Sequence, residues 1–336
     1  MEAHIKAISY FLPEQKLDNK KLNSLFPEWS VDKISAKTGI FERRITNEQT
    51  FSSDLGVKAA EKLFSEHDIS PLEIDYILFC TQSPDYFLPT TACLVQDRLG
   101  IPTSAGALDY NLGCSGFVYG LGLAKGLILA EEATNVLLIT AETYSKFIHP
   151  NDKSNRTIFG DAAAATLISN EPGIAKIGKS NVGTDGKGAE NLIVKNGGLR
   201  NRQQNDREAL TDEYGNTHHD DFLFMNGSEI FNFTSEMVPA LVETTLKRNK
   251  LDTEDIDLYI FHQANKFMLN HLRKKIKIDE NKFYYFLENC GNTVSSTIPI
   301  ALYHAILDKR AKGNVLLAGF GVGYSWGGLI LEFVPN

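Results

Sequence analysis

The sequence predicts an α/β protein built from two similar halves. Residues 70–80 and 252–262 share a pattern in which a helix-capping start precedes an apolar, β-rich run. Residues 135–140 and 314–319 form a second matching pair, and both are continuous apolar runs typical of strands buried on both faces of a sheet. Helix and strand patterns alternate along the chain, which favours layers of helices and sheets. The repeat therefore indicates a duplicated α/β unit.

The repeat also predicts where the halves divide and how they meet. We expect one half at 1–172 and the other at 173–336. Each half carries a turn and a helix between its matching segments, and aligning the second pair places Cys114 within one residue of Asn292. Two halves packed about a pseudo-dyad would bring these helix starts to one cleft. Residues 185–221 fit neither half, and their Gly, Asn, Asp and Arg content predicts a long surface excursion.

The composition is typical of a globular protein of the cytoplasm. A chain of 336 residues that is 43% hydrophobic can bury a large core, and its net charge of −8 gives no basic field for nucleic acid. We see no signal peptide at the start and no apolar stretch near the roughly eighteen residues that a membrane helix needs. The four cysteines are widely spaced, which predicts a reducing compartment and neither a disulfide framework nor a zinc site.

Cys114 is the first candidate for chemistry. It lies at a junction between a strand and a helix, with Gly113 before it and Gly116 shortly after. Unpaired amides and the positive end of the helix dipole lower the pKa of a cysteine at such a position, which makes it a nucleophile. The alternative is a buried structural cysteine, a common role for this residue type. The junction alone leaves both interpretations open.

Three further positions have a functional and a structural interpretation. His262 follows a buried strand, where ligands collect in open α/β sheets, but a lone histidine is more often structural. Asn292 can be a catalytic amide or a cap for the following helix. The glycine-rich residues 319–324 predict either a tight turn or backbone amides that face an oxyanion.

The histidine and aspartate pairs at 218–221 have the residue types of a metal site. They lie in the predicted excursion, and the sequence offers no supporting ligands near them. We therefore predict no metal site.

Taken together, the motifs of this chain resemble β-ketoacyl-acyl-carrier-protein synthase III. The matching segments follow the family order over nearly the whole chain and comprise 38–44, 113–116, 159–163, 262–265, 291–293 and 320–327. The resemblance implies a homodimeric, thiolase-like fold with α-β-α-β-α layers. It also implies an active site of cysteine, histidine and asparagine, which maps onto Cys114, His262 and Asn292.

The chemistry that the resemblance implies is a decarboxylative condensation. Cys114 takes an acyl group from coenzyme A or an acyl carrier protein, and a malonyl thioester then loses carbon dioxide and attacks it. His262 and Asn292 donate hydrogen bonds to the thioester oxygen where charge develops, and the amides of Cys114 and Val322 hold the oxyanion of acyl transfer. No metal or redox cofactor is implied, because the thioesters are substrates.

Several substrate contacts depart from the family pattern. Lys33 replaces a tryptophan that stacks on the coenzyme A adenine, Lys37 resembles the arginine beside it, and Arg156 lies near a nucleotide-contacting arginine. Leu88 stands where a phenylalanine reaches into the partner's acyl pocket. We therefore expect a starter larger than acetyl and a carrier protein in preference to coenzyme A.

Two further groups of residues complete the expected contacts. Met225 and Gly227 are other positions that can limit the acyl pocket. Lys274 and Lys275 match a basic pair that contacts the acidic carrier, whereas Phe267 replaces the basic residue that meets the carrier after the histidine motif.

Two other functions remain open at this stage. One is simple acyl transfer from Cys114 to an amine or hydroxyl, without decarboxylation. The other is a non-catalytic subunit that shapes a partner synthase. Gln82 stands where related enzymes carry a glutamate base, and an amide cannot abstract a proton, so decarboxylation is the favoured source of the carbanion.

Overall fold

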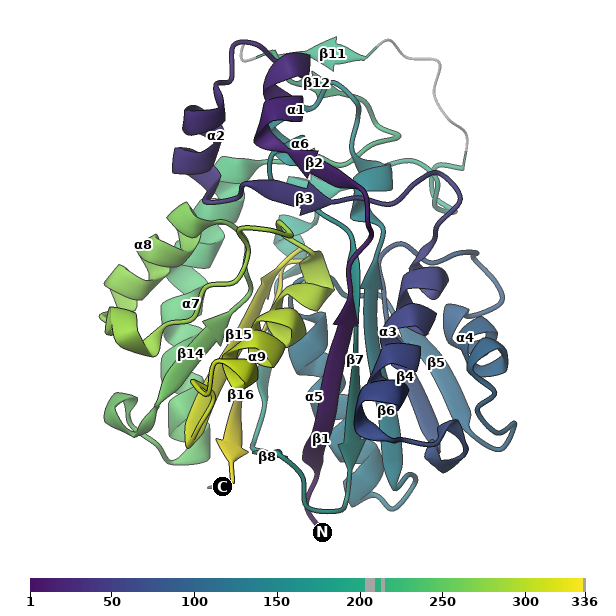
Figure 1. The fold of residues 1–336 in the computed structure, drawn as a ribbon. Coiled ribbons are helices and arrows are strands. Elements are labelled where there is room, and N and C mark those ends of the chain that lie inside the picture. Colours follow the sequence, from purple (N-terminus) through teal and green to yellow (C-terminus); the bar gives the residue numbers. More distant parts are fainter. Residues whose placement is uncertain (203–208, 213–214, 335–336) are drawn as a thin grey trace.

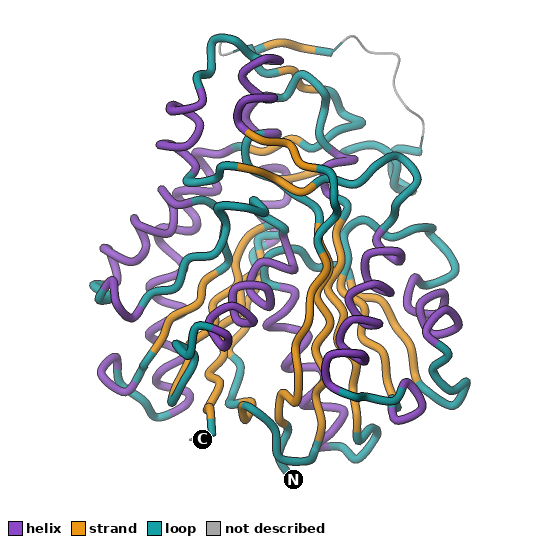
Figure 2. Tube along the Cα trace, in the orientation of Figure 1, coloured by secondary structure: helices purple, strands orange, loops and turns teal. Residues whose placement is uncertain are grey.

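The computed structural model describes residues 1–202, 209–212 and 215–334. In Figure 1 the strands run through the centre of the molecule, with helices on both outer sides and two helices between the halves. Figure 2 shows the same arrangement coloured by secondary structure. Both chain ends lie at the bottom of these views. The α/β class and the two similar halves that the sequence predicts are confirmed.

The first half is a five-stranded sheet covered on its outer face by two helices. Its strands are β1 (His4–Phe11), β4 (Tyr76–Cys80), β5 (Gly106–Tyr110), β6 (Asn135–Glu142) and β7 (Ala162–Ser169). The covering helices are α3 (Ser52–His67) and α4 (Thr91–Leu99), which pack on the sheet through apolar side chains of one core cluster. Strand β4 pairs in parallel with β5 and β6, and β6 pairs antiparallel with β7.

The second half repeats this arrangement. Its strands are β8 (Ala175–Ile177), β9 (Asn181–Thr184), β14 (Leu258–Phe261), β15 (Asn314–Gly321) and β16 (Ser325–Phe333). Its outer helices are α7 (Gly227–Asn249) and α8 (Lys266–Ile276), packed on a second core cluster. Strand β14 pairs in parallel with β15, which pairs antiparallel with β16, as β4, β6 and β7 do.

The two halves meet in the middle of the molecule. Helices α5 (Gly116–Leu129) and α9 (Thr297–Leu307) lie between the sheets, and both are rich in apolar residues that share a third core cluster with strands of both halves. Strand β8 joins the sheets, because it pairs with both β1 and β16. The expected division near residue 172 falls in the loop between β7 and β8. Helix α5 precedes β6 and α9 precedes β15, so the two helix starts occupy equivalent places.

Short elements gather at one end of the sheets, at the top of Figure 1. They comprise β2 (Lys16–Asp18), α1 (Asn19–Leu25), α2 (Val31–Thr38), β3 (Glu42–Arg44), α6 (Lys153–Arg156), β10 (Leu192–Ile193), β11 (Leu210–Thr211), β12 (Thr217–His218) and β13 (Phe224–Met225). The 3₁₀ turns are η1 (Pro71–Glu73), η2 (Tyr144–Phe147), η3 (Gly186–Asn191), η4 (Thr253–Asp255), η5 (Glu280–Lys282) and η6 (Val294–Ser296). Among the described residues, no helix has the length and apolar character needed to cross a membrane.

The predicted excursion at 185–221 is only partly a surface feature. It contains η3 and three short strands, and β10 pairs with β13 beyond its end. Leu192 is buried and packs in one apolar cluster with Cys114. Residues 203–208 and 213–214 of the excursion lie outside the described residues. The side chain of Leu192 thus connects this segment to the candidate site.

Candidate active site

Cys114 lies in the short segment between β5 and α5, two residues before the helix begins. Its side chain is 7% exposed. The amide of Gly116 donates a hydrogen bond of 2.8 Å to the carbonyl of Gly113, which folds the chain back just before the helix. A Cβ atom on Gly321 of β15 would lie 3.0 Å from the Cys114 sulfur. Because Gly321 has no side chain, the second half contacts the Cys114 thiol here through backbone atoms.

The structure corrects one expectation for Cys114. The helix start predicts a lowered thiol pKa, but burial raises the pKa of Cys114 to about 12, and the nearby Glu142 carboxyl adds to the rise. The desolvation of a thiolate outweighs the partial charge of a helix end in this enclosed position. Cys114 is therefore a neutral thiol at neutral pH, and forming a thiolate there would need a proton acceptor.

His262 follows directly after β14, and its ring is held by one hydroxyl group. Its Nδ1 lies 2.7 Å from Oγ1 of Thr297, at the start of α9. The Thr297 hydroxyl donates to the carbonyl of Val294 at 3.0 Å, so its oxygen is left to accept from His262 Nδ1–H. Nε2 of the neutral ring then carries the lone pair. Burial lowers the pKa of His262 to about 3, which keeps the ring neutral at neutral pH.

Asn292 makes one hydrogen bond within its turn and still has a side-chain donor left. Its Oδ1 accepts a hydrogen bond of 2.9 Å from the amide of Val294, at the start of η6. This fixes the side-chain oxygen on the backbone donor and leaves Nδ2 as the end that can donate elsewhere. Asn292 is 4% exposed. The sequence allows Asn292 to cap the following helix, but the N-cap residues are Thr293 for η6 and Ser296 for α9, so Asn292 makes only a local turn bond, which does not compete with donation.

The three predicted catalytic residues are connected through β15 and one apolar cluster. The amide of His262 donates to the carbonyl of Ala318 on β15 at 2.8 Å, three residues before Gly321, which contacts Cys114. Asn292 pairs in a β-bridge with Phe159, and the Phe159 ring packs in the cluster that contains Cys114. The fold thus brings both halves to one region, as the repeat predicts.

A larger part of the glycine-rich segment 319–324 belongs to a strand than the sequence predicts. Strand β15 runs to Gly321 and only 322–324 form the turn to β16. A Cβ atom on Gly319 would lie 2.6 Å from the carbonyl oxygen of Cys114, so no other residue fits there. Val322 packs at the edge of the Cys114 cluster, and its carbonyl accepts from Ser325 Oγ at 3.0 Å.

The predicted acyl-pocket residues lie in different surroundings. Met225 is half-buried against the Cys114 cluster, beside Leu192, which pairs with it across β10 and β13. Gly227 is exposed at the start of α7. Leu88 is 84% exposed, in a loop that a single chain leaves bare. Leu192 is a site candidate that the sequence did not reveal, because it falls inside the predicted excursion.

The predicted coenzyme A contacts include an aromatic ring that the sequence analysis missed. The amines of Lys33 and Lys37 lie over the Trp29 ring, 5.6 and 5.2 Å from its centroid. A tryptophan therefore lies just before α2, near the position where the sequence has Lys33. Arg156 donates to the carbonyl of Pro150 at 2.6 Å and lines a cavity of about 260 Å³ that reaches Phe159.

The predicted carrier contacts differ from each other. Lys274 lines a groove of about 610 Å³ between α2 and α8, together with the exposed ring of Phe267. Lys275 instead donates to Ser235 Oγ on α7 at 2.9 Å. Lys274 therefore has the more open position of the two.

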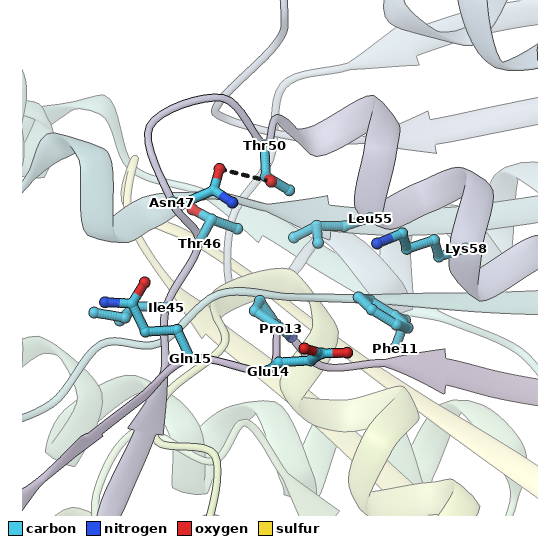
Figure 3. A pocket seen from close by; sticks show the side chains of 10 residues that line it. All are labelled: Phe11, Pro13, Glu14, Gln15, Ile45, Thr46, Asn47, Thr50, Leu55 and Lys58. Atoms are coloured by element: carbon cyan, nitrogen blue, oxygen red, sulfur yellow. Dashed lines mark hydrogen bonds between the residues drawn. The ribbon is translucent and has the colours of Figure 1, made fainter.

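A separate cavity of about 490 Å³ lies between α3 and the segments that follow β1 and β3 (Figure 3). Its lining residues are Phe11, Pro13, Glu14, Gln15, Ile45, Thr46, Asn47, Thr50, Leu55 and Lys58. In the close-up Thr50 donates a hydrogen bond to Asn47, which braces one rim. The lining includes no predicted catalytic residue, so cavity size alone does not locate the site.

Comparisons with known proteins agree with the fold and identify a family. A model described as 3-oxoacyl-[acyl-carrier-protein] synthase III matches residues 108–186, and a model of the C-terminal part of the same enzyme matches 246–333. The β-ketoacyl-[acyl-carrier-protein] synthase III of Clostridium tetani is 37% identical over 339 residues, covering 99% of each chain. That of Chlamydia muridarum is 36% identical over 335 residues and also covers 99% of each chain.

Solved structures give the same picture. A crystal structure of a 3-oxoacyl-(acyl-carrier-protein) synthase III matches with a TM-score of 0.97 and 50% identity, over 99% of this chain and 100% of that one. The corresponding synthase of Burkholderia xenovorans matches with a TM-score of 0.90 and 36% identity, over 100% and 95%. The fold and the buried cysteine junction define a thiolase-fold enzyme. The chain belongs to the 3-oxoacyl-[acyl-carrier-protein] synthase III family.

Proposed function

We propose that the chain catalyses the decarboxylative condensation of an acyl thioester with a malonyl thioester, through an acyl group carried on Cys114. The observation that supports this best is the convergence of Cys114, the His262 strand and the Asn292 turn on one enclosed region. The names of its relatives, β-ketoacyl-[acyl-carrier-protein] synthase III, support the same reaction.

The first step in this proposal is acyl transfer to Cys114. The thiol gives its proton to Nε2 of His262, the sulfur attacks the acyl carbonyl, and the donor leaves as a thiolate that water protonates. The backbone amides of Cys114 and Val322 would hold the oxyanion. A neutral imidazole is needed for this step, and the low pKa of His262, caused by burial, favours that state.

The second step uses the proton that His262 has received. A malonyl thioester loses carbon dioxide, and its electrons move onto the thioester oxygen, to which Asn292 Nδ2 and His262 Nε2–H would donate. The enolate carbon then attacks the acyl carbonyl, so that a carbon–carbon bond forms and the bond to Cys114 breaks. The departing sulfur recovers the proton from His262. One such donor contributes roughly 3–4 kcal/mol to a developing oxyanion.

We propose a homodimer, which would work in the cytoplasm without a metal or redox cofactor. The loop at Leu88 supports the dimer, because Tyr86, Phe87 and Leu88 are 62, 77 and 84% exposed. That loop is tied to edge strand β5, since Asp109 accepts hydrogen bonds of 2.6 and 2.7 Å from the first amides of α4. An unpaired strand edge beside exposed apolar rings is a surface that a second copy would cover. Sedimentation should therefore give twice the mass of the chain.

The donor and extender in this proposal are thioesters of coenzyme A or of an acyl carrier protein. Lys274 beside exposed Phe267 suits an acidic carrier with an apolar patch. Lys37 and Arg156 would contact the phosphates of either donor, and Trp29 offers a ring for a base. The acyl chain would lie against Met225, near Gly227, with Leu88 supplied by the second copy.

The experiment that tests the proposal separates acylation from condensation. The protein is incubated with a panel of acyl thioesters, and the label is located by peptide mass spectrometry. Malonyl carrier protein is then added and carbon dioxide release is measured. We expect the label on Cys114 and release that needs the acyl-enzyme, while Cys114→Ser abolishes both and Cys93→Ser, an exposed cysteine, changes neither.

Other outcomes would favour the two alternatives. A label on Cys80 or Cys290 contradicts the assignment of the nucleophile. Acyl-enzyme formation without any release of carbon dioxide, together with transfer to an amine or hydroxyl, indicates simple acyl transfer. Failure of every thioester to label the protein indicates a non-catalytic subunit.

A further inference from the structure

One carboxyl group contacts the loops of both halves beneath the site. Glu142 is the last residue of β6 and is 0% exposed. It accepts hydrogen bonds from the amide of Gln82 at 3.1 Å, from Ser83 Oγ at 3.1 Å and from Ser295 Oγ at 2.9 Å. Gln82 and Ser83 follow β4 of the first half, whereas Ser295 belongs to η6 of the second. No ion pair found among the described residues includes this carboxyl.

The first-half contact leads to the nucleophile. The Gln82 side chain reaches the segment before Cys114, because a Cβ atom on Gly113 would lie 2.5 Å from Gln82 Oε1. Ser83 Oγ also accepts from the amide of Thr143 at 2.9 Å, which ties the loop to the residue after Glu142. The carboxyl therefore fixes the loop that packs against the cysteine junction.

The second-half contact leads to the other two predicted catalytic residues. Ser295 lies in η6, and the first amide of η6, that of Val294, donates to Oδ1 of Asn292. Thr297, which holds the His262 ring, follows two residues after Ser295. A second bond from β6 holds the same turn, since Thr140 Oγ1 and Ser296 Oγ are 2.9 Å apart. The end of β6 is thus hydrogen-bonded to the turn that contains the Asn292 bond to Val294 and the Thr297 contact with His262.

We propose that Glu142 is a positioning residue, which sets the two halves of the site against each other and whose negative charge, when present, opposes formation of the Cys114 thiolate. The proposal rests on the function proposed for Cys114. It adds a role for a group that does not touch the substrate and that the resemblance does not assign.

The electrostatics of the surrounding groups support this effect of the Glu142 charge. Burial raises the pKa of Glu142 to about 8, and the carboxyl of Asp161 adds to the rise. An ionised Glu142 in turn raises the pKa of Cys114, Cys80 and Tyr144. These four groups, Asp161, Cys114, Cys80 and Tyr144, are all acids, and two negative charges in so enclosed a place oppose each other. Protonated Glu142 removes this opposition.

The test is the pH dependence of thiol reactivity, which a purely structural role would not change. Cys114 is alkylated with iodoacetamide over a range of pH, and the rate is read from the Cys114 peptide, which excludes exposed Cys93. In the wild type the rate should rise with pH and then flatten near pH 8, where Glu142 ionises. Glu142→Gln should show no such bend and should react about fivefold faster than the wild type at about pH 9.

A matched control changes a carboxyl at the other end of the same strand. Asp75 accepts hydrogen bonds of 2.8 Å from the amides of Thr134 and Asn135, where β6 begins. Asp75→Asn should keep the wild-type bend in the alkylation profile. If Glu142→Gln does not fold, Ser295→Ala serves instead, because it removes a bond that lowers the Glu142 pKa and should move the bend to higher pH.

The outcomes separate this inference from the proposed function. Superimposable profiles for wild type and Glu142→Gln, or an unmoved bend in Ser295→Ala, overturn the role of Glu142. Carbon dioxide release is measured on the same samples. A shifted alkylation profile in a protein that releases no carbon dioxide supports Glu142 and contradicts the proposed condensation.

Discussion

The Nδ1 atom of His262 donates to the hydroxyl of Thr297, a residue that lies 35 positions away and begins a different helix. The hydroxyl is itself committed to the Val294 carbonyl, so the contact selects one tautomer of the ring. The lone pair at Nε2 is thereby made available to accept a proton. Removing the Thr297 hydroxyl should therefore impair His262.

Thr297→Val keeps the shape of the side chain but removes the acceptor for Nδ1–H. We expect turnover to fall by about ten- to a hundredfold, because the ring loses its fixed tautomer and orientation. Thr297→Ser should recover most of the activity. Thr245→Val, a similar change at a buried hydroxyl of α7 that makes no hydrogen bond, is the control and should leave turnover unchanged. The rates of acyl-enzyme formation and of condensation are measured separately, and normal rates in Thr297→Val would contradict the prediction.

Asn292→Asp distinguishes the capping oxygen from the donor amide. The carboxylate can still accept from the Val294 amide, so the turn should fold, but the donor is replaced by a negative charge. We expect acyl-enzyme to form at near-normal rates, while carbon dioxide release falls by roughly two to three orders of magnitude. Asn292→Ala loses the bond to the Val294 amide as well and should lose about 1 kcal/mol of stability. Full condensation by Asn292→Asp would show that Asn292 has only a structural role in its turn.

His262 makes the folded protein sensitive to acid. Its pKa is about 3 in the folded state and 6.5 ordinarily, so the unfolded chain binds the proton first as the pH falls. The stability that neutral His262 contributes is present above pH 6.5 and is lost as the pH falls towards 3. Between pH 7 and pH 4 the loss should be about 3 kcal/mol. Denaturant unfolding of wild type and His262→Gln at both pH values gives the difference, and equal losses in the two proteins would contradict it.

Charge reversal at the two lysines of α8 should have unequal effects on a carrier protein. Lys274 lines the groove beside Phe267, whereas Lys275 is bonded to Ser235. Lys274→Glu should weaken carrier-dependent turnover and flatten its salt dependence, and Lys275→Glu should do so less. Turnover with coenzyme A thioesters is the control and should change little. Equal turnover on both kinds of thioester in the wild type, with no salt effect, would contradict a preference for the carrier.

Leu88→Phe should shift the preferred starter towards shorter acyl groups. The side chain is exposed in the single chain, so this prediction requires that the second copy in the proposed dimer receives it. A panel of acyl thioesters of increasing length measures the profile. An unchanged profile in a dimeric variant would place the limit within the chain, at Met225 or Gly227.

The sequence predicted the places that depend on strand and helix order. The repeat placed Cys114 and Asn292 before equivalent helices, and α5 and α9 confirm the helices. It could not predict the thiol pKa, because the burial of Cys114 depends on β15 of the other half. The division at residue 172, the catalytic roles and the substrate contacts stay predictions.

Other residues were missed because their signals are short. Glu142 is the last residue of an apolar run, and an acid at such a position usually marks the exposed end of a strand. Because the run is so apolar, burial of this acid could also have been predicted. Trp29 reaches Lys33 and Lys37 across a turn, so motif alignment by position passes over it. Thr297 lies in a run of hydroxyl residues, and only the fold shows which of them meets His262.

The central position of α5 and α9 restricts how such an enzyme can change. Each helix begins at the site and is packed by strands of both halves, so a substitution along either one alters the core and the chemistry together. New substrates are therefore more easily accommodated at the top of the molecule, where α2 and the short strands β10 to β13 lie outside the two sheets. Divergence within the family should accumulate there, while the buried helices keep their sequence.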